Sequence, residues 1–195
     1  MAATERLYKS DLGDVRQDHL SRYLWAAERL GDKGHVIDAA CGCGYGSSIL
    51  ADRGCTVTAI DVSEPALVYA KRHWDRPSIT WTQMNLLDDP VLPDADAVVS
   101  FETLEHLKRP KMFLRAAHKA APRLIVSVPN EDVVPWSKSR NPFHCRHYTK
   151  SQLEKRLREC GWKIQAWFGQ RDKFSNVWAD LEECRTIIAD AVRLD

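Results

Sequence analysis

The sequence predicts an α/β protein built on a Rossmann-like, doubly wound sheet of six or seven strands. Short apolar segments alternate with amphipathic ones along most of the 195 residues, as expected for parallel strands covered by helices. A glycine cluster, CGCGYG, separates the first such pair, which is typical of the first strand–helix turn in these sheets. The length fits a single domain over residues 1–195, divided into a helix at 14–30, a core at 35–169 and a tail at 170–195.

The first element is an amphipathic helix over residues 14–30, because its apolar residues recur about every 3.6 positions and Gly31 can end it. The apolar run HVIDAA, 35–40, leads into the glycines, as a buried parallel strand does. A short helix over 47–54 and a second strand over 55–62 complete the first repeat of the pattern.

The middle of the chain repeats the alternation of helices and strands. Ser63 can cap a helix over 64–74, because its hydroxyl can accept from a backbone N–H of the first turn. Strands are expected over 78–86 and 95–101, and Pro110 can begin the helix that follows the second of them, over 110–120.

The last third begins with a fifth strand over 123–128 and a long irregular segment over 129–148. A helix over 150–160 has capping-box spacing at its start, and a sixth strand follows over 161–169. The tail is ambiguous: DLEECRTIIADAVRLD has helical spacing, whereas its part RTIIADAV also reads as a strand.

Composition and charge exclude several classes of protein. The net charge of +1 gives no general affinity for nucleic acid or anionic membranes, so nucleic acid is an unlikely partner. No apolar run approaches the roughly 18 residues that span a bilayer, and the polar N-terminus does not resemble a signal peptide. The six cysteines are then expected as thiols in a reducing cytoplasm, and the C-x-C pair at Cys41 and Cys43 lacks a second pair to complete a zinc site.

The strongest chemical signal is the segment VIDAACGCGYGSS, in which Asp38 precedes Gly42, Gly44 and Gly46. Glycines here allow a tight turn and let a ligand approach the main chain. Asp61 ends the next strand, where a carboxylate can accept hydrogen bonds from the ribose of a nucleoside cofactor. A turn without a ligand and a dinucleotide-dependent oxidoreductase are the alternatives.

The G-x-G-x-G loop after Asp38 resembles the first motif of class I S-adenosylmethionine (SAM)-dependent methyltransferases. The likeness covers nearly the whole chain and includes relatives of the ubiquinone-biosynthesis O-methyltransferase type. It implies the class I methyltransferase fold with a seventh, antiparallel strand, which favours a strand at RTIIADAV. It also implies that SAM is the cofactor, that Arg22 meets its methionine carboxylate and that Asn85 meets its adenine. The residues that it implies for cofactor binding are Arg22, Asp38, Ala39, Gly42, Gly44, Asp61, Val62, Asn85, Leu86 and Phe101.

The segment ETLEH follows the fourth strand and carries Glu102, Glu105 and His106. On one helical turn these three side chains would share a face, and His144 or His147 from the later loop could join them. Glu102, Glu105, His106 and His144 would then bind a divalent metal such as Mg²⁺ or Mn²⁺. The E-x-x-E-H pattern resembles those of ubiquinone-biosynthesis and small-RNA 2′-O-methyltransferases, which implies such a metal.

Two alternatives to the metal site remain at this stage. His106 and His144 can act as metal-free catalytic acids or bases, or the cluster can be structural. We expect a SAM-dependent methyltransferase acting on a hydroxyl of a small-molecule acceptor. A metal-dependent RNA 2′-O-methyltransferase and a non-catalytic SAM-binding protein of this fold are the alternatives.

Overall fold

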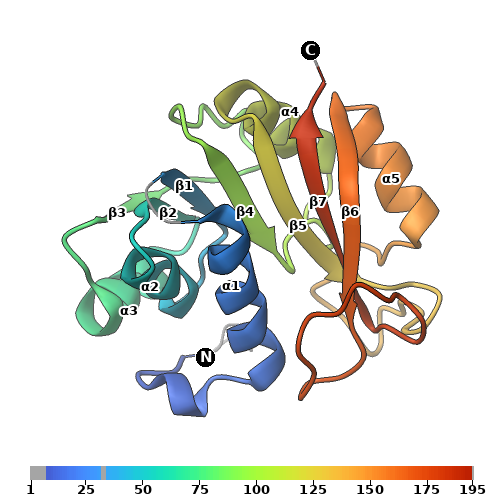
Figure 1. Ribbon diagram of the computed structural model, residues 1–195, viewed down its shortest axis with the longest axis horizontal. Helices are drawn as coiled ribbons and strands as arrows, with labels where there is room; N and C mark the ends of the chain where they lie inside the picture. The colour runs from blue at the N-terminus through green and yellow to red at the C-terminus, as the bar shows by residue number, and fades with distance from the viewer. Residues whose placement is uncertain (1–7, 32–33, 195) are drawn as a thin grey trace.

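The computed structural model describes residues 8–31 and 34–194, and its seven strands form one sheet in the order β3-β2-β1-β4-β5-β7-β6 (Figure 1). The strands are β1 (His35–Ala39), β2 (Thr56–Asp61), β3 (Ile79–Gln83), β4 (Ala97–Phe101), β5 (Arg123–Pro129), β6 (Trp162–Gln170) and β7 (Thr186–Arg193). The helices are η1 (Leu12–Asp14), α1 (Gln17–Leu30), α2 (Tyr45–Asp52), α3 (Glu64–Trp74), α4 (Pro110–Ala120) and α5 (Lys150–Arg158). The predicted doubly wound α/β fold is confirmed.

Each face of the sheet buries a separate hydrophobic cluster. Side chains of α1, α2 and α3 pack in one cluster, and those of α4 and α5 pack in the other. Neighbouring strand residues divide between the two, since Val99 of β4 faces the first and Val98 the second, as the two-residue period of a strand requires. The helices therefore cover both faces, and the carboxyl ends of the parallel strands are left to carry the loops.

The C-terminal strand β7 lies between β5 and β6 and pairs antiparallel with both. Its Asp190 is fully buried and accepts hydrogen bonds from Arg29 of α1, at 2.8 Å, and from Arg123 of β5. The strand reading of RTIIADAV is thus confirmed, and the helical reading is wrong. Sheet pairing along the whole segment outweighs its helical spacing, which a single sequence cannot reveal.

Several predicted bounds differ from the structure; the helix predicted over 47–54 is α2 (Tyr45–Asp52), and the strand predicted over 78–86 is β3 (Ile79–Gln83). The first helix begins at Gln17 rather than at residue 14, because Asp11 caps the short helix η1 and the chain is extended at Val15. The segment ETLEH forms a single turn, in which the His106 N–H donates to the Thr103 carbonyl at 3.0 Å, and no regular helix. Within the described ranges, no helix is both long and apolar enough to cross a membrane.

Candidate functional site

The glycine loop joins β1 to α2, and its three glycines meet different structural requirements. Gly42 has a φ of +57°, and a Cβ added to it would meet nothing described within 4 Å. A Cβ at Gly44 would lie 2.5 Å from that of Ala70, and one at Gly46 would lie 2.1 Å from Tyr23 Cζ. Gly44 and Gly46 therefore permit close packing of the loop, whereas Gly42 faces open space.

Asp61 at the end of β2 joins the glycine loop to the start of α3. Its carboxylate accepts the Gly42 N–H at 3.0 Å and the Ser63 N–H at 2.8 Å. The side chain is buried, while Val62 beside it is half exposed. The structure thus brings together Gly42, Asp61 and Val62, three of the predicted cofactor residues, at the carboxyl ends of β1 and β2.

Asp38 is fully buried, and both of its carboxylate oxygens are occupied. They accept hydrogen bonds from Tyr23 of α1, at 3.0 Å, and from Ser47 of α2, at 2.6 Å. Burial raises the pKa of this carboxyl to about 6, against the opposing effect of the two hydroxyl donors. Asp38 therefore ties α1 and α2 to β1.

The other predicted cofactor residues lie on the neighbouring strand ends. Asn85, after β3, donates to Asp88 at 2.6 Å and accepts the Leu87 N–H at 3.0 Å. Phe101, at the end of β4, packs edge-on against Tyr23 with 5.0 Å between ring centroids. Two further predicted residues are buried, Ala39 and Leu86.

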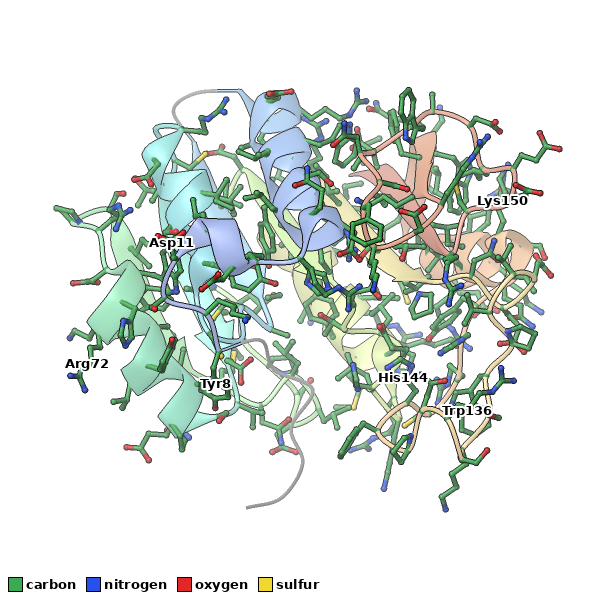
Figure 2. The ribbon with its side chains drawn as sticks, turned by 90° about the horizontal axis from the view of Figure 1, so that it is seen from below. Tyr8, Asp11, Arg72, Trp136, His144 and Lys150 are labelled. Atoms are coloured by element: carbon green, nitrogen blue, oxygen red, sulfur yellow. The ribbon has the colours of Figure 1, made fainter. Side chains whose placement is uncertain are left out.

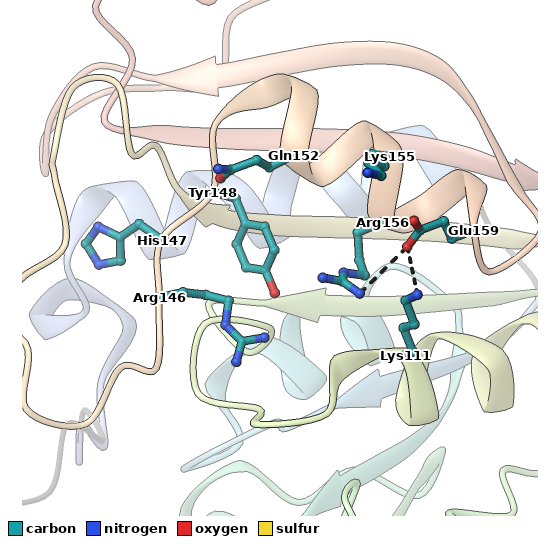
Figure 3. A pocket seen from close by; sticks show the side chains of 8 residues that line it. All are labelled: Lys111, Arg146, His147, Tyr148, Gln152, Lys155, Arg156 and Glu159. Carbon is teal, nitrogen blue, oxygen red and sulfur yellow. Dashed lines mark ion pairs between the residues drawn. The ribbon is translucent and has the colours of Figure 1, made fainter.

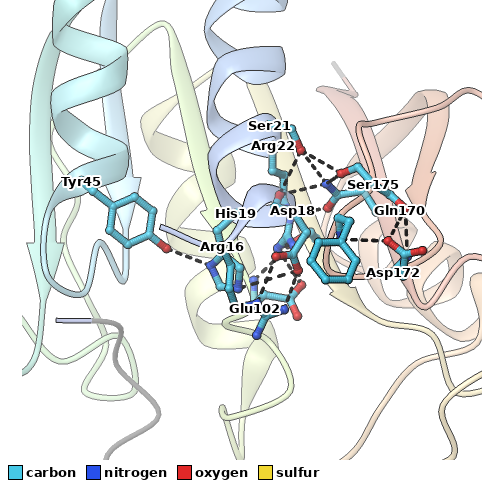
Figure 4. A network of polar contacts seen from close by, with 12 residues as sticks. Arg16, Asp18, His19, Ser21, Arg22, Tyr45, Glu102, Gln170, Asp172 and Ser175 are labelled. Carbon is cyan, nitrogen blue, oxygen red and sulfur yellow. Dashed lines mark hydrogen bonds and ion pairs between the residues drawn. The ribbon is translucent and has the colours of Figure 1, made fainter. Parts of the chain in front are cut away.

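Arg22 lies at the centre of a buried polar network that joins α1 to the sheet (Figure 4). Its guanidinium lies 3.0 Å from a carboxylate oxygen of Glu102, and it donates to Gln170 at 2.8 Å and to Ser127 at 3.1 Å. Neither Gln170 nor Ser127 was predictable as a site residue. Both stand on strands as ordinary polar residues, so no local pattern marked them.

Glu102 stands apart from the other proposed metal ligands. Its backbone has a left-handed φ of +49°, which is uncommon for a residue with a side chain, and its carboxylate accepts the Ser127 hydroxyl at 2.8 Å. Because Glu102 itself has this left-handed backbone, it is not part of the turn that follows. The shared helical face expected for Glu102, Glu105 and His106 is therefore not formed.

Glu105, His106 and His144 do come together, with one potential ligand atom from each lying within 4.8 Å of the others. The loop after β5 reaches the ETLEH turn, because Cys145 N–H donates to the Glu105 carbonyl at 2.7 Å. Figure 2 views the molecule from the carboxyl ends of β4 and β5, with His144 labelled on that loop. Three of the four predicted metal ligands thus form one cluster at this edge of the sheet.

His147, which the sequence suggested as an alternative to His144, is not one of the three clustered residues but contacts His144. Its Nδ1 donates to the Val134 carbonyl at 2.6 Å, and its Nε2 lies 2.8 Å from His144 Nδ1. Burial and the two neighbouring histidines lower the pKa of His144 to about 4. With a neutral His147, His144 Nδ1 must be the donor, so its Nε2 carries the lone pair.

The family comparison agrees with this geometry. A sequence profile described as "Methyltransferase domain" matches residues 11–166. A probable S-adenosylmethionine-dependent methyltransferase of Mycobacterium tuberculosis is 34% identical over 135 residues, which are 65% of this chain and 47% of that protein. A ubiquinone biosynthesis O-methyltransferase of Pseudomonas aeruginosa is 36% identical over 106 residues, covering 50% and 44%. The chain therefore spans about half the length of these curated relatives.

Solved structures show the same fold. The CcbJ methyltransferase from Streptomyces caelestis superposes with a TM-score of 0.73 at 13% identity, over 89% of this chain and 94% of that one. The methyltransferase domain of bacterial CtHen1-C gives 0.68 at 21% identity, over 92% and 98%. The predicted class I fold is confirmed by these neighbours, and the profile match shows that the chain belongs to the methyltransferase domain family.

Proposed function

We propose that this chain is an active SAM-dependent methyltransferase that methylates a hydroxyl group of a small molecule. The main support for a hydroxyl acceptor is the cluster of Glu105, His106 and His144 after β4. This strand is the neighbour of β1, from which the glycine loop starts. A hydroxyl is a poor nucleophile until it loses its proton, so an enzyme for this reaction needs such a group near the acceptor. The ubiquinone relatives, named as O-methyltransferases, support the same choice.

The cofactor would lie across the ends of β1, β2 and β4. Gly42 leaves room for the cofactor to contact the main chain, and the Asp61 carboxylate, which accepts the Gly42 N–H, would accept hydrogen bonds from the ribose hydroxyls. Asn85 would meet the adenine. Arg22 would bind the methionine carboxylate of the cofactor. Its guanidinium would then contact this carboxylate and that of Glu102 at the same time.

Methyl transfer is an in-line displacement, in which the bond from sulfur to the methyl carbon breaks as the acceptor oxygen forms its bond to that carbon. The chain's contribution is to hold donor and acceptor in line and to take the hydroxyl proton. We assign this role to His144, whose Nδ1 faces His147 Nε2 and whose ring is neutral at pH 7, so that Nε2 would take the proton.

The donor set also fits a divalent cation. One carboxylate and two imidazoles suit Mn²⁺ better than Mg²⁺, which prefers oxygen ligands. Glu105, His106 and His144 would hold the ion, which would supply Lewis-acid activation of the hydroxyl. Glu102 is not part of this set.

The test uses SAM labelled on its methyl group, incubated with the purified protein and separate pools of small metabolites, RNA, DNA and protein. The expected result is label in the small-metabolite pool, lost in Glu105→Gln and in Asp61→Ala, with only the second variant losing SAM binding. Label in the RNA pool alone would replace the small-molecule proposal by the RNA 2′-O-methyltransferase alternative. SAM binding without label in any pool would count against turnover.

A chelator arm separates the two modes of activation. Loss of transfer with a chelator and recovery with Mn²⁺ would support the cation. Transfer that ignores the chelator would leave His144 as the proton acceptor. The reducing cytoplasm remains the expected compartment for this reaction.

A further inference from the structure

A hollow of about 560 Å³ lies between α4 and α5, and none of its lining residues belongs to the glycine loop (Figure 3). Four positively charged side chains line it, and they are opposed by the single carboxylate of Glu159. The four are Lys111, Arg146, Lys155 and Arg156. The whole chain carries a net charge of only +1, so this concentration of cations is local and does not reflect a generally basic protein.

The cations are not neutralised by the protein. Lys111 lies 2.9 Å from Glu159, and Arg156 lies 3.7 Å from the same carboxylate. One acid thus serves two cations. Among the residues that the structure describes, Arg146 and Lys155 form no ion pair, and Arg156 Nε is buried without a hydrogen-bond acceptor. Like charges held together repel one another, and an anion between them would relieve this repulsion.

The elements around the hollow strengthen its positive potential. α4 begins at Pro110, next to Lys111; its first turn contains no acidic residue, and the side chain of its N-cap residue Arg109 does not cap the helix. The amino end of a helix carries a partial positive charge that favours anions. Guanidinium groups match the oxygens of a phosphate in geometry as well as charge.

We propose that this hollow binds a small molecule through a phosphate group. The volume is within the usual range of about 300–1,000 Å³ for small-ligand sites, and the aromatic ring of Tyr148 forms part of the wall. A phosphate would lie among Arg146, Lys155 and Arg156, with Lys111 at the α4 side. This site is separate from the methyl-transfer site and does not depend on the proposed function.

The hollow contacts the methyl-transfer site through one side chain. His147 lines it and is hydrogen-bonded to His144. Arg146 is adjacent in sequence and donates to the Lys108 carbonyl at 3.3 Å. An anion bound to Arg146 would therefore act on the loop that carries both histidines.

Binding of ribose 5-phosphate, inorganic pyrophosphate and ribose to the full chain, measured by titration calorimetry, tests the proposal. Saturable binding of both phosphates is expected, with no binding of ribose. Arg156→Gln should weaken the phosphates about tenfold, as expected for the loss of a charged hydrogen-bond donor. Arg158→Gln is the matched control. It removes the ion pair between Arg158 and Glu154 of the same helix, 2.9 Å apart and outside the hollow, and should leave phosphate binding unchanged.

Three results would overturn the proposal. The first is no binding of either phosphate. The second is binding that Arg156→Gln leaves unchanged or that Arg158→Gln weakens equally. The third is a single-stranded RNA oligonucleotide that binds far more tightly than ribose 5-phosphate and is equally sensitive to Arg156→Gln, because the phosphate would then come from a nucleic acid. Unchanged circular dichroism and unfolding temperature of both variants show that they are folded.

Discussion

His147 Nε2 lies 2.8 Å from His144 Nδ1, and the opposite side of the His147 ring donates to the Val134 carbonyl. A carbonyl can only accept, so His147 Nδ1 is a donor, and with a neutral His147 ring its Nε2 accepts from His144 Nδ1. His144 therefore directs its unprotonated nitrogen away from His147. Substitution of a residue that orients a reactive or metal-binding imidazole in this way typically lowers activity or metal affinity by about 10–100-fold.

His147→Ala should lower the turnover of methyl transfer by about 10–100-fold. SAM affinity should be unchanged, because the hydrogen bonds of His147 among the described residues go to Val134 and His144, not to the glycine loop. The measurement is single-turnover transfer together with SAM binding. His73→Ala, an exposed histidine of α3, controls for the loss of an imidazole. A parallel loss of SAM binding would show that His147 acts on the fold rather than on His144.

Glu102→Gln should destabilise the protein by about 2 kcal/mol, because it removes the nearer of the two carboxylates beside the buried Arg22 guanidinium, at 3.0 Å, and leaves Asp18 at 3.6 Å. Arg22 keeps its hydrogen bond to Gln170, which limits the loss. Urea unfolding monitored by tryptophan fluorescence measures this change. Glu154→Gln removes an exposed pair with Arg158 and should cost about 0.5 kcal/mol or less. Equal losses in the two variants would contradict a special role for the buried pair.

Gly42 and Gly46 should respond differently to alanine. Gly46→Ala places a Cβ 2.1 Å from the Tyr23 ring and should destabilise the fold by about 2 kcal/mol or more. The Cβ of Gly42→Ala would meet no described atom within 4 Å, so its cost is the left-handed φ of +57°, about 1 kcal/mol. Its main effect should be on SAM affinity, read by calorimetry. Full SAM binding in Gly42→Ala would remove Gly42 from the cofactor site.

The stability should fall in acid partly because of His19. Its Nδ1 lies 2.8 Å from the Tyr45 hydroxyl, and burial, followed by nearby Arg22, lowers its pKa from 6.5 to about 3. The unfolded chain therefore binds the proton more tightly than the folded chain. This contribution to stability is fully present above pH 6.5 and is lost progressively as the pH falls towards 3.

His19→Gln should reduce this pH dependence. Between pH 6.5 and 4.5 the free energy of unfolding of the variant should fall by about 2 kcal/mol less than that of the native chain. Urea midpoints across this range provide the comparison, and the exposed His73→Gln serves as control. Identical pH profiles for His19→Gln and the native chain would show that His19 is not the group responsible.

The order of elements was predictable because strand and helix periods are local properties. The glycine loop and Asp61 were equally visible, since each follows a buried strand. The partners of Arg22 were not, because Ser127 and Gln170 meet it only when β5 and β6 are placed in the sheet. The sequence predicted Glu102 on a helical face because a left-handed backbone, here φ +49°, is expected at glycine and not at glutamate. The roles of the predicted site residues remain predictions.

The position of β7 also governs the order in which the sheet can assemble. Among the seven strands of the described residues, β6 pairs with β7 alone, and β7 lies between β5 and β6 although it follows both of them in the sequence. During synthesis, strands β1 to β5 can pair as they emerge, because each partner is already available. β6 and α5 must wait until residues 186–193 have been added, so this half of the molecule exposes apolar surface for longest while the chain is nascent.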